Sequence, residues 1–231
     1  MIQPFPRIPH FPGSNAGPDD LVLEASEARI YYETKAIVLE KLDGINVAIG
    51  RGRRGTLSAS LRGVWSRESR ARLTRTIGIY LELHRAELGA LLGPHDTLYG
   101  EWLYHRLSVP YDRLEDDFVG IALRSHGELI PAEEAMARIE GAGLTPNRPV
   151  FRGRLRNPSH LRSLVGQSRF GRTRMEGLIV EIDHERRWAK WVDAAYRKHP
   201  RGRVPEEKNE VLGANANRAS QSRSPPNTRN S

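Results

Sequence analysis

The chain has 231 residues, which is enough for one substantial hydrophobic core or two small ones. It contains no cysteine, which excludes disulfides, a thiol nucleophile and a cysteine-bound zinc site. It has neither a signal-peptide core nor a long apolar run, so we expect a cytoplasmic protein with no membrane partner, and the formal net charge of +8 favours a polyanionic partner.

Composition divides the chain into three regions. Residues 1–20 form a proline-rich leader, and residues 21–200 form a body that alternates many predicted strands with few helices. That alternation indicates the α+β class. Residues 201–231 are rich in Pro, Asn, Ser, Arg and Gly, so we predict a polar tail that is disordered from 214 to 231.

A single lysine lies between an apolar run and a glycine early in the body. Residues 36–39 are typical of a buried strand and residues 45–49 of a second, so Lys41 is expected where the two meet, and Gly44 would let the backbone turn close to a ligand. A free lysine has a pKa near 10.4, so a nucleophilic role would need a lowered pKa. The alternative is a surface lysine in a hairpin, because Lys-x-Asp-Gly alone occurs by chance in roughly one such chain in twenty.

Three helices are predicted further along the chain. Apolar residues recur at helical spacing over 70–92, and Gly-Pro at 93–94 would end that helix. Shorter helices are predicted over 131–139, which begins with proline, and over 157–166, which Asn157 would cap. The first of these helices, over 70–92, is expected to be scaffold.

Three further segments place charged residues on short predicted strands. Glu101 lies in the strand 99–102, Glu176 opens the strand 176–181, and Lys190 is the inward lysine of 188–192. The order of lysine, Gly-Glu, Glu-Gly with an apolar run, and a second lysine resembles motifs I, III, IV and V of the covalent nucleotidyltransferase superfamily. DNA ligases, RNA ligases and mRNA capping enzymes belong to it.

Within that superfamily the chain most resembles the ATP-dependent RNA ligases of the RNA ligase 2 type. Glu40 precedes the candidate nucleophile, Asn46 follows it by five positions, and Arg62 lies about twenty positions beyond. The resemblance implies an ATP-grasp-like nucleotidyltransferase domain of two antiparallel β-sheets flanked by helices. It also implies ATP and Mg²⁺ or Mn²⁺ as cofactors, and RNA as the partner, a nicked duplex with an RNA 3′-hydroxyl strand being one form of it.

The implied reaction is RNA sealing, as in RNA repair. Lys41 would attack the α-phosphate of ATP, hold AMP as a lysyl-adenylate and pass it to a 5′-phosphate end, which a 3′-hydroxyl then attacks. Glu40 would accept a hydrogen bond from the adenine amino group, and Glu101 would hold a ribose hydroxyl. Asn46 and Arg62 would contact phosphates or the incoming end.

The resemblance assigns the remaining charged residues to phosphate and metal. Glu176, with Glu101, would orient a largely hydrated metal ion, and Lys190 would neutralise the α-phosphate and help to lower the pKa of Lys41. Asp43 would either position the lysine or serve the final sealing step; both roles stay open.

The chain departs from the family pattern at two places. The aromatic residue that stacks on adenine is replaced by Ile121, while Phe118 lies one strand pleat out of register, so the stacking residue is one of these two. The second basic residue of motif V is replaced by Val192.

Arginines crowd two stretches, and a solvated surface and a phosphate track are both open interpretations. They are Arg51, Arg53, Arg54, Arg148, Arg152, Arg154, Arg156, Arg162, Arg169, Arg172 and Arg174.

Other functions compete with RNA ligation. A minimal DNA ligase or a capping-type nucleotidyltransferase shares the core, but the 39 mostly polar residues after Val192 are too few for the barrel that both usually carry. A catalytically inactive end-binding module is a further alternative, although all four charged motif residues are present. The RNA ligase 2 type also has a small C-terminal helical domain. The polar composition after Val192 leads us to expect that this chain does not form it, and a protein partner is one source of such a domain.

Overall fold

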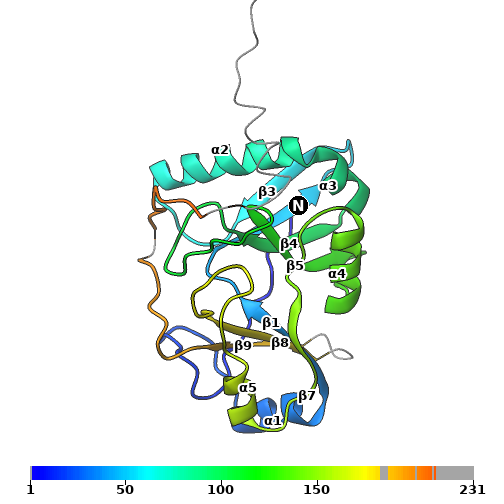
Figure 1. The fold of residues 1–231 in the computed structure, drawn as a ribbon. Coiled ribbons are helices and arrows are strands. Elements are labelled where there is room, and N and C mark those ends of the chain that lie inside the picture. Colours follow the sequence, from blue (N-terminus) through cyan, green and yellow to red (C-terminus); the bar gives the residue numbers. More distant parts are fainter. Residues whose placement is uncertain (1, 183–186, 201, 210, 212–231) are drawn as a thin grey trace, which may run out of the picture.

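Two antiparallel β-sheets form the centre of the protein (Figure 1). The computed structural model describes residues 2–182, 187–200, 202–209 and 211. The four-stranded sheet has the order β7 (Pro149–Arg154), β1 (Lys35–Lys41), β8 (Gly177–Ile182) and β9 (Arg187–Val192). The five-stranded sheet has the order β3 (Leu57–Leu61), β2 (Ile45–Arg51), β4 (Thr97–Trp102), β5 (Phe118–Ser125) and β6 (Glu128–Leu129).

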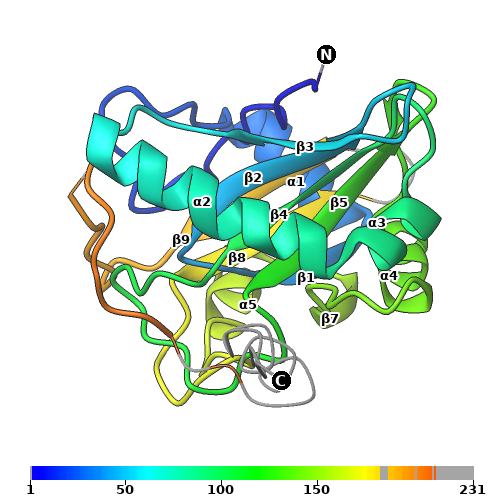
Figure 2. The ribbon, with the colours of Figure 1, turned by 90° about the horizontal axis from the view of Figure 1, so that it is seen from above.

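Helices cover the outer faces of the two sheets, which confirms the predicted α+β architecture. α2 (Arg67–Leu83) and α3 (Arg85–Leu91) lie on the five-stranded sheet, seen from above in Figure 2. α1 (Ala25–Glu33) and α5 (Pro158–Ser163) pack on the four-stranded sheet, and α4 (Ala132–Gly141) packs beside β5.

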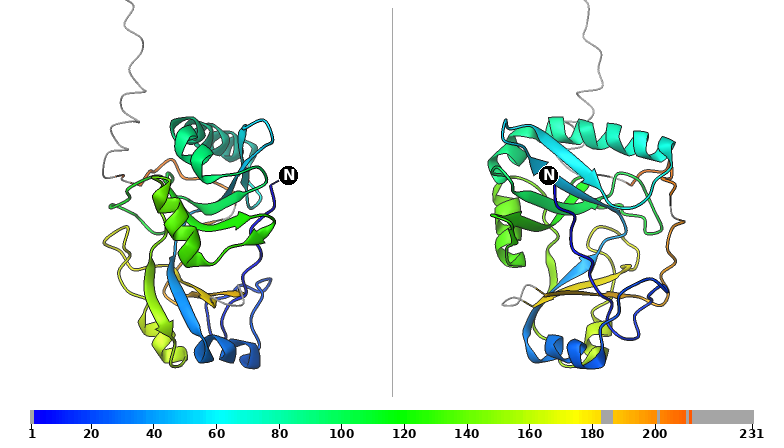
Figure 3. Two further views of the ribbon diagram at one scale, coloured as in Figure 1. Left: turned by 90° about the vertical axis from the view of Figure 1, so that its right-hand side faces the viewer. Right: turned by 180° about the vertical axis from the view of Figure 1, so that it is seen from behind.

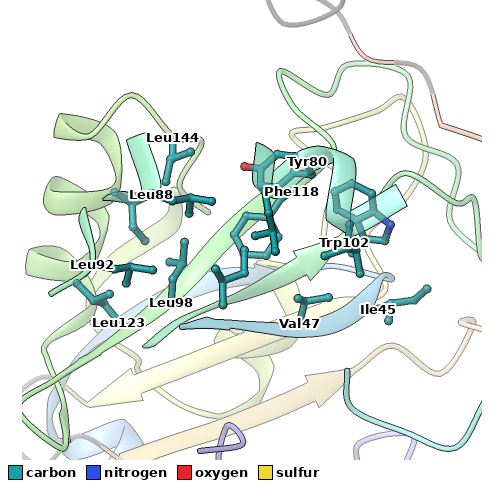
Figure 4. Packing of buried hydrophobic residues seen from close by; sticks show 14 of the residues in the cluster. Ile45, Val47, Tyr80, Leu88, Leu92, Leu98, Trp102, Phe118, Leu123 and Leu144 are labelled. Atoms are coloured by element: carbon teal, nitrogen blue, oxygen red, sulfur yellow. The ribbon is translucent and has the colours of Figure 1, made fainter. Parts of the chain in front are cut away.

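The core under α2 is rich in large side chains (Figure 4). The ring of Phe118 lies 5.7 Å from that of Tyr80 and shares the cluster with Trp102. A second apolar cluster lies between the sheets and includes Leu39, Ile121 and residues from β2, β4 and β8. The inner faces of the two sheets therefore pack against each other through this cluster.

The alternative interpretation of Lys41, a surface lysine in a hairpin, is wrong. β1 pairs with β7 and β8, whereas β2 pairs with β3 and β4, so residues 42–44 carry the chain from one sheet to the other. Gly44 is required in this link, because a Cβ there would lie 2.6 Å from Leu103 Cδ2 and 3.0 Å from Trp102 O. Lys41 is therefore at the junction of the two sheets.

The predicted long helix is divided in two. Ser66 accepts a hydrogen bond from the Ser69 amide and starts α2 earlier than predicted, while His84, with a φ of −106°, ends α2 and precedes α3. Apolar spacing continues through this break, so periodicity alone does not reveal it. The helices predicted near 131–139 and 157–166 are present as α4 and the shorter α5, and Asn157 caps α5 by accepting from the His160 amide at 2.8 Å.

Both ends of the described chain pack on the body. The centroid of the Phe5 ring lies 5.1 Å from that of Tyr99 and 5.5 Å from that of Trp188, between the sheets. The orange segment 202–209 runs up to α2 (Figure 3), where Val204 is buried, although the sequence assigned this stretch to a polar tail. The disorder predicted for 214–231 lies outside the described residues.

Candidate active site

Lys41 lies at the end of β1 and forms an ion pair with Glu176. The Nζ atom is 2.8 Å from Glu176 Oε1, and the lysine side chain is 23% exposed. Glu176 immediately precedes β8, whose Gly177 is opposite Lys41 in the antiparallel register. A Cβ on Gly177 would lie 2.0 Å from the Trp191 carbonyl, so a glycine is needed for β8 and β9 to pair beside the lysine.

The five-stranded sheet contributes the next carboxylate. Glu101 on β4 is opposite Asn46 on β2, and Asn46 Nδ2 donates to Glu101 Oε1 at 3.5 Å. The charge of Glu101 acts on Lys41. The predicted motif residues from both sheets are thus brought together around one amine.

The charges around the amine are strongly coupled. Burial raises the pKa of Glu101 to about 8 and that of Glu176 to about 7, although the Lys41 ammonium opposes both shifts. Burial also lowers the pKa of Lys41, but the carboxylates of Glu176 and Glu101 outweigh it, so the pKa of Lys41 is raised. The expected depression of this pKa is therefore wrong for the protein without nucleotide, and the amine is held protonated.

The pKa of Lys190 on β9 is lowered, which is the change that was expected for Lys41. Burial, followed by the charge of Lys41, lowers the pKa of Lys190 to about 8. Its Nζ lies 3.8 Å from Asp20 Oδ1, and Asp20 Oδ2 lies 3.5 Å from His10 Nε2. The leader therefore places a carboxylate beside Lys190, which the sequence did not reveal.

Asp43 is held by four hydrogen bonds. Its amide donates to Tyr111 Oη, and its Oδ2 accepts from the amides of Ser108 and Val109, all at 2.7 Å. Its Oδ1 accepts from Tyr196 Oη at 2.7 Å. Because both carboxylate oxygens are engaged, this arrangement favours a role in positioning the lysine over a role in sealing.

Glu40 is fully buried and accepts hydrogen bonds from one backbone amide and one side-chain amide. Its Oε2 accepts from the Arg169 amide at 3.0 Å, and its carbonyl accepts from Asn147 Nδ2 at 2.8 Å. Glu40 Oε1 and Asn147 Oδ1 are buried and have no hydrogen-bond partner among the described residues. Two acceptors are thus open here, and Asn147 was not identified from the sequence.

Arg62 lies near Asn46 and Phe5. It follows β3, and its amide donates to the Asn46 carbonyl at 3.0 Å while its Nη1 reaches the Phe5 carbonyl at 3.5 Å. The charge of Arg62 contributes to the lowered pKa of Lys190. Arg62 is therefore positioned between Asn46 and the leader.

Ile121 and Phe118 face opposite sides of β5. Phe118 packs under α2, away from the inner face, whereas Ile121 belongs to the cluster between the sheets. The register between β4 and β5 shifts after Tyr99, which pairs with Ala122 while Gly100 pairs with Gly120, so Ile121 is bulged. Of the two candidates, only Ile121 lies on the inner side.

The free oxygens of Glu101 and Glu176 fit a divalent ion. Both Oε2 atoms are buried and have no hydrogen-bond partner in the described part of the chain. No group of three or more His, Cys, Asp or Glu residues that could hold a metal is present among the described residues. Two carboxylates suit an ion that keeps most of its water ligands.

Much of the basic stretch before Glu176 is neutralised. Ion pairs join Arg148 to Glu140, Arg152 to Glu133, Arg172 to Asp112 and Arg174 to Asp193. These pairs favour a solvated surface over a phosphate track for those four arginines.

None of the helices in the described part of the chain has the length and apolar character needed to span a bilayer.

A sequence model of the RNA ligase family matches residues 34–192. The match spans more than half of the chain and contains both lysines of the site, and the chain belongs to the RNA ligase family. None of the curated proteins matches the sequence.

Solved RNA ligase structures share the fold. An archaeal ATP-dependent RNA ligase aligns with a TM-score of 0.52 and 19% identity, over 83% of this chain and 48% of that chain. A variant of the Naegleria gruberi RNA ligase with ATP and Mn aligns with a TM-score of 0.54 and 14% identity, over 73% and 52%. The chain spans about half the length of these two structures.

Proposed function

We propose that this protein is an ATP-dependent RNA ligase that joins 5′-phosphate and 3′-hydroxyl ends through a lysyl-AMP intermediate and serves RNA repair. The observation that carries the proposal is the ion pair of 2.8 Å between Lys41 and Glu176, with Glu101 supplied by the other sheet. A lysine enclosed by carboxylates at a sheet junction is a costly arrangement for a scaffold, and it suits phosphoryl transfer.

The first step transfers AMP to the protein. The Lys41 ammonium releases its proton to solvent, the amine forms a bond to the α-phosphorus of ATP, and the bond to pyrophosphate breaks. A divalent ion bound by Glu101 and Glu176 would offset the negative charge that holds the pKa of Lys41 high. Lys190, whose pKa is lowered to about 8, would neutralise the α-phosphate.

The other site residues would hold the nucleotide and the RNA ends. Glu40 Oε1 is an open acceptor that suits the adenine amino group, and Ile121 would cover a face of the base. Glu101 would hold a ribose hydroxyl, and Asn46 and Arg62 would contact phosphates or the incoming end.

Two further transfers complete the reaction. An oxygen of the 5′-phosphate end attacks the AMP phosphorus, and the bond to the Lys41 nitrogen breaks. The 3′-hydroxyl of the second strand then attacks the activated 5′-phosphate, and AMP leaves.

Use of ATP and a divalent metal has support from the Naegleria gruberi RNA ligase, which was solved with ATP and Mn. The substrate proposal is tested with nicked duplexes that differ only in the 3′-hydroxyl strand, RNA against DNA, with Mg²⁺ and with Mn²⁺. We expect sealing of the RNA nick and much slower sealing of the DNA nick. Sealing of the DNA nick alone would overturn RNA as the substrate and favour a minimal DNA ligase.

A protein that labels with ATP but seals neither nick would need a second protein. Because the chain spans about half of the related structures, a partner that supplies further RNA contacts is the corresponding proposal. Addition of a cell extract to the labelled protein and the RNA nick tests it, with the Lys41→Ala protein as the control for ligases already in the extract.

A further inference from the structure

The segment 202–209, here called the C-terminal strap, bonds to a loop beside the active site. This loop, residues 103–111, is here called the clamp loop. The Arg106 amide donates to the Glu207 carbonyl at 2.9 Å, and Asn209 Nδ2 donates to the Leu103 carbonyl at 2.7 Å. Asn209 Oδ1 accepts from the Tyr111 amide at 2.9 Å. Asn209 therefore joins the two ends of the clamp loop.

The clamp loop is also the main support of Asp43. Ser108, Val109 and Tyr111 provide three of the hydrogen bonds to this residue, each 2.7 Å long. Asp43 and Tyr111 are both buried, so these bonds are shielded from water. A continuous set of hydrogen bonds thus runs from Asn209 through Tyr111 to Asp43, two residues from Lys41.

The strap is anchored at its other end on α2. The Ser66 amide donates to the Gly202 carbonyl at 2.9 Å, and the Val204 amide donates to Ser69 Oγ at 3.1 Å. The buried Val204 side chain joins the core under α2. The strap is therefore fixed to α2 before it reaches the clamp loop, and this limits the movement of Asn209.

We propose that Asn209 and Tyr111 are positioning residues for the nucleophile Lys41, through the hydrogen bonds that join Asn209 to the clamp loop and the clamp loop to Asp43. Asn209 fixes the clamp loop, and the loop fixes Asp43 in the short link between β1 and β2. That link fixes the backbone next to Lys41, and with it the direction of the Lys41 side chain. The inference rests on the proposed function, because it gives Lys41 the role of nucleophile.

Kinetics of lysine adenylylation test the proposal. Asn209→Ala should slow single-turnover labelling by α-labelled ATP about tenfold, the effect of losing buried hydrogen bonds, while the ATP dissociation constant changes less than about twofold. Tyr111→Phe should act in the same way. The double variant should be no slower than the slower single variant, because both act through Asp43.

Two further variants separate positioning from general damage. Asn209→Asp keeps the acceptor for the Tyr111 amide and should restore part of the rate. Glu206→Ala is the matched control, since this strap residue is 88% exposed and pairs only with Arg72 among the described residues, and it should label at the wild-type rate. Wild-type labelling by Asn209→Ala, or an equal loss in Glu206→Ala, would overturn the proposal.

Hydrogen exchange gives a readout that needs no activity. The amides of Asp43, Ser108 and Val109 should exchange faster in Asn209→Ala than in the wild type, while amides of α4 should not change. Unchanged protection at these three amides would overturn the proposal even if labelling were slow. A wild-type protein that is not labelled at all would overturn the proposed function alone, since the exchange result would still decide the role of the strap.

Discussion

Replacing Glu101 by glutamine should stabilise the protein at neutral pH and impair its reaction with ATP. Burial raises the pKa of this carboxyl from 4.5 to about 8, so the folded protein keeps a proton that the unfolded chain releases. Between these two pH values the free energy of unfolding of the wild type falls as pH rises. Glutamine has the same shape and no such proton, so the variant escapes this loss.

The size of the effect follows from the shift. Each pH unit between the two pKa values changes the free energy of unfolding by about 1.4 kcal/mol, so the 2.5 units between pH 4.5 and pH 7 give at most about 3 kcal/mol in favour of the variant. The gain should vanish near pH 4.5 and level off above pH 8. For a chain of this size it corresponds to a rise in melting temperature of about 6 to 12 °C at pH 7.

Urea unfolding at pH 5, 7 and 8.5 measures this difference, with the exposed Glu115→Gln as a control that should show no pH-dependent gain. Labelling by ATP should fall in Glu101→Gln, because the variant lacks a carboxylate of the site. A variant that is less stable than the wild type at pH 7, or a gain that does not change with pH, would refute the reasoning about burial.

Four other variants provide further tests. Gly177→Ala should destabilise the fold and abolish labelling, because its Cβ would lie 2.0 Å from the Trp191 carbonyl; a folded variant that labels normally would contradict the close packing of β8 and β9. Phe118→Ala should lower the free energy of unfolding by about 3 to 5 kcal/mol without weakening ATP binding to the folded protein. Ile121→Ala should weaken ATP binding, and equilibrium ATP binding below the melting temperature distinguishes the two variants. Weaker ATP binding in Phe118→Ala alone would make Phe118 the base-stacking residue. Deletion of residues 212–231 should leave the rate of labelling by ATP unchanged and weaken RNA binding modestly in low salt. A large loss of labelling, measured by denaturing electrophoresis, would show that the tail belongs to the site.

Local sequence signals were sufficient to predict the strands of the candidate site and their charged residues. The apolar run before Lys41, the Gly-Glu of β4 and the Glu-Gly that opens β8 are each short patterns that reflect strand formation and close backbone approach. Their order along the chain predicted the family, which the match over residues 34–192 confirms. The two-sheet architecture followed from that resemblance.

Long-range partners could not be predicted in this way. The hydroxyl groups of Tyr111 and Tyr196 reach Asp43 from positions 68 and 153 residues away along the chain. The residues around these tyrosines form no pattern that indicates contact with Asp43. The strap residues 202–209 are mostly polar, so composition predicted a tail, whereas Val204 and the backbone bonds fix them to the body.

Two further features of the site were also beyond the sequence analysis, and each has a local physical cause. The bulge at Ile121 cannot be read from periodicity, because it depends on how β4 and β5 pair. The charge state of Lys41 was predicted from the need for a neutral nucleophile, whereas the structure without nucleotide shows two carboxylates that raise its pKa.

Covalent labelling of Lys41 tests the central claim most directly. The wild type and the Lys41→Ala variant are incubated with α-labelled ATP or GTP and a divalent metal, and each protein is then separated by denaturing electrophoresis. We predict a labelled wild-type band with ATP, little label with GTP, and no label on Lys41→Ala. A label that survives in Lys41→Ala, or an equal label from GTP, would contradict this claim.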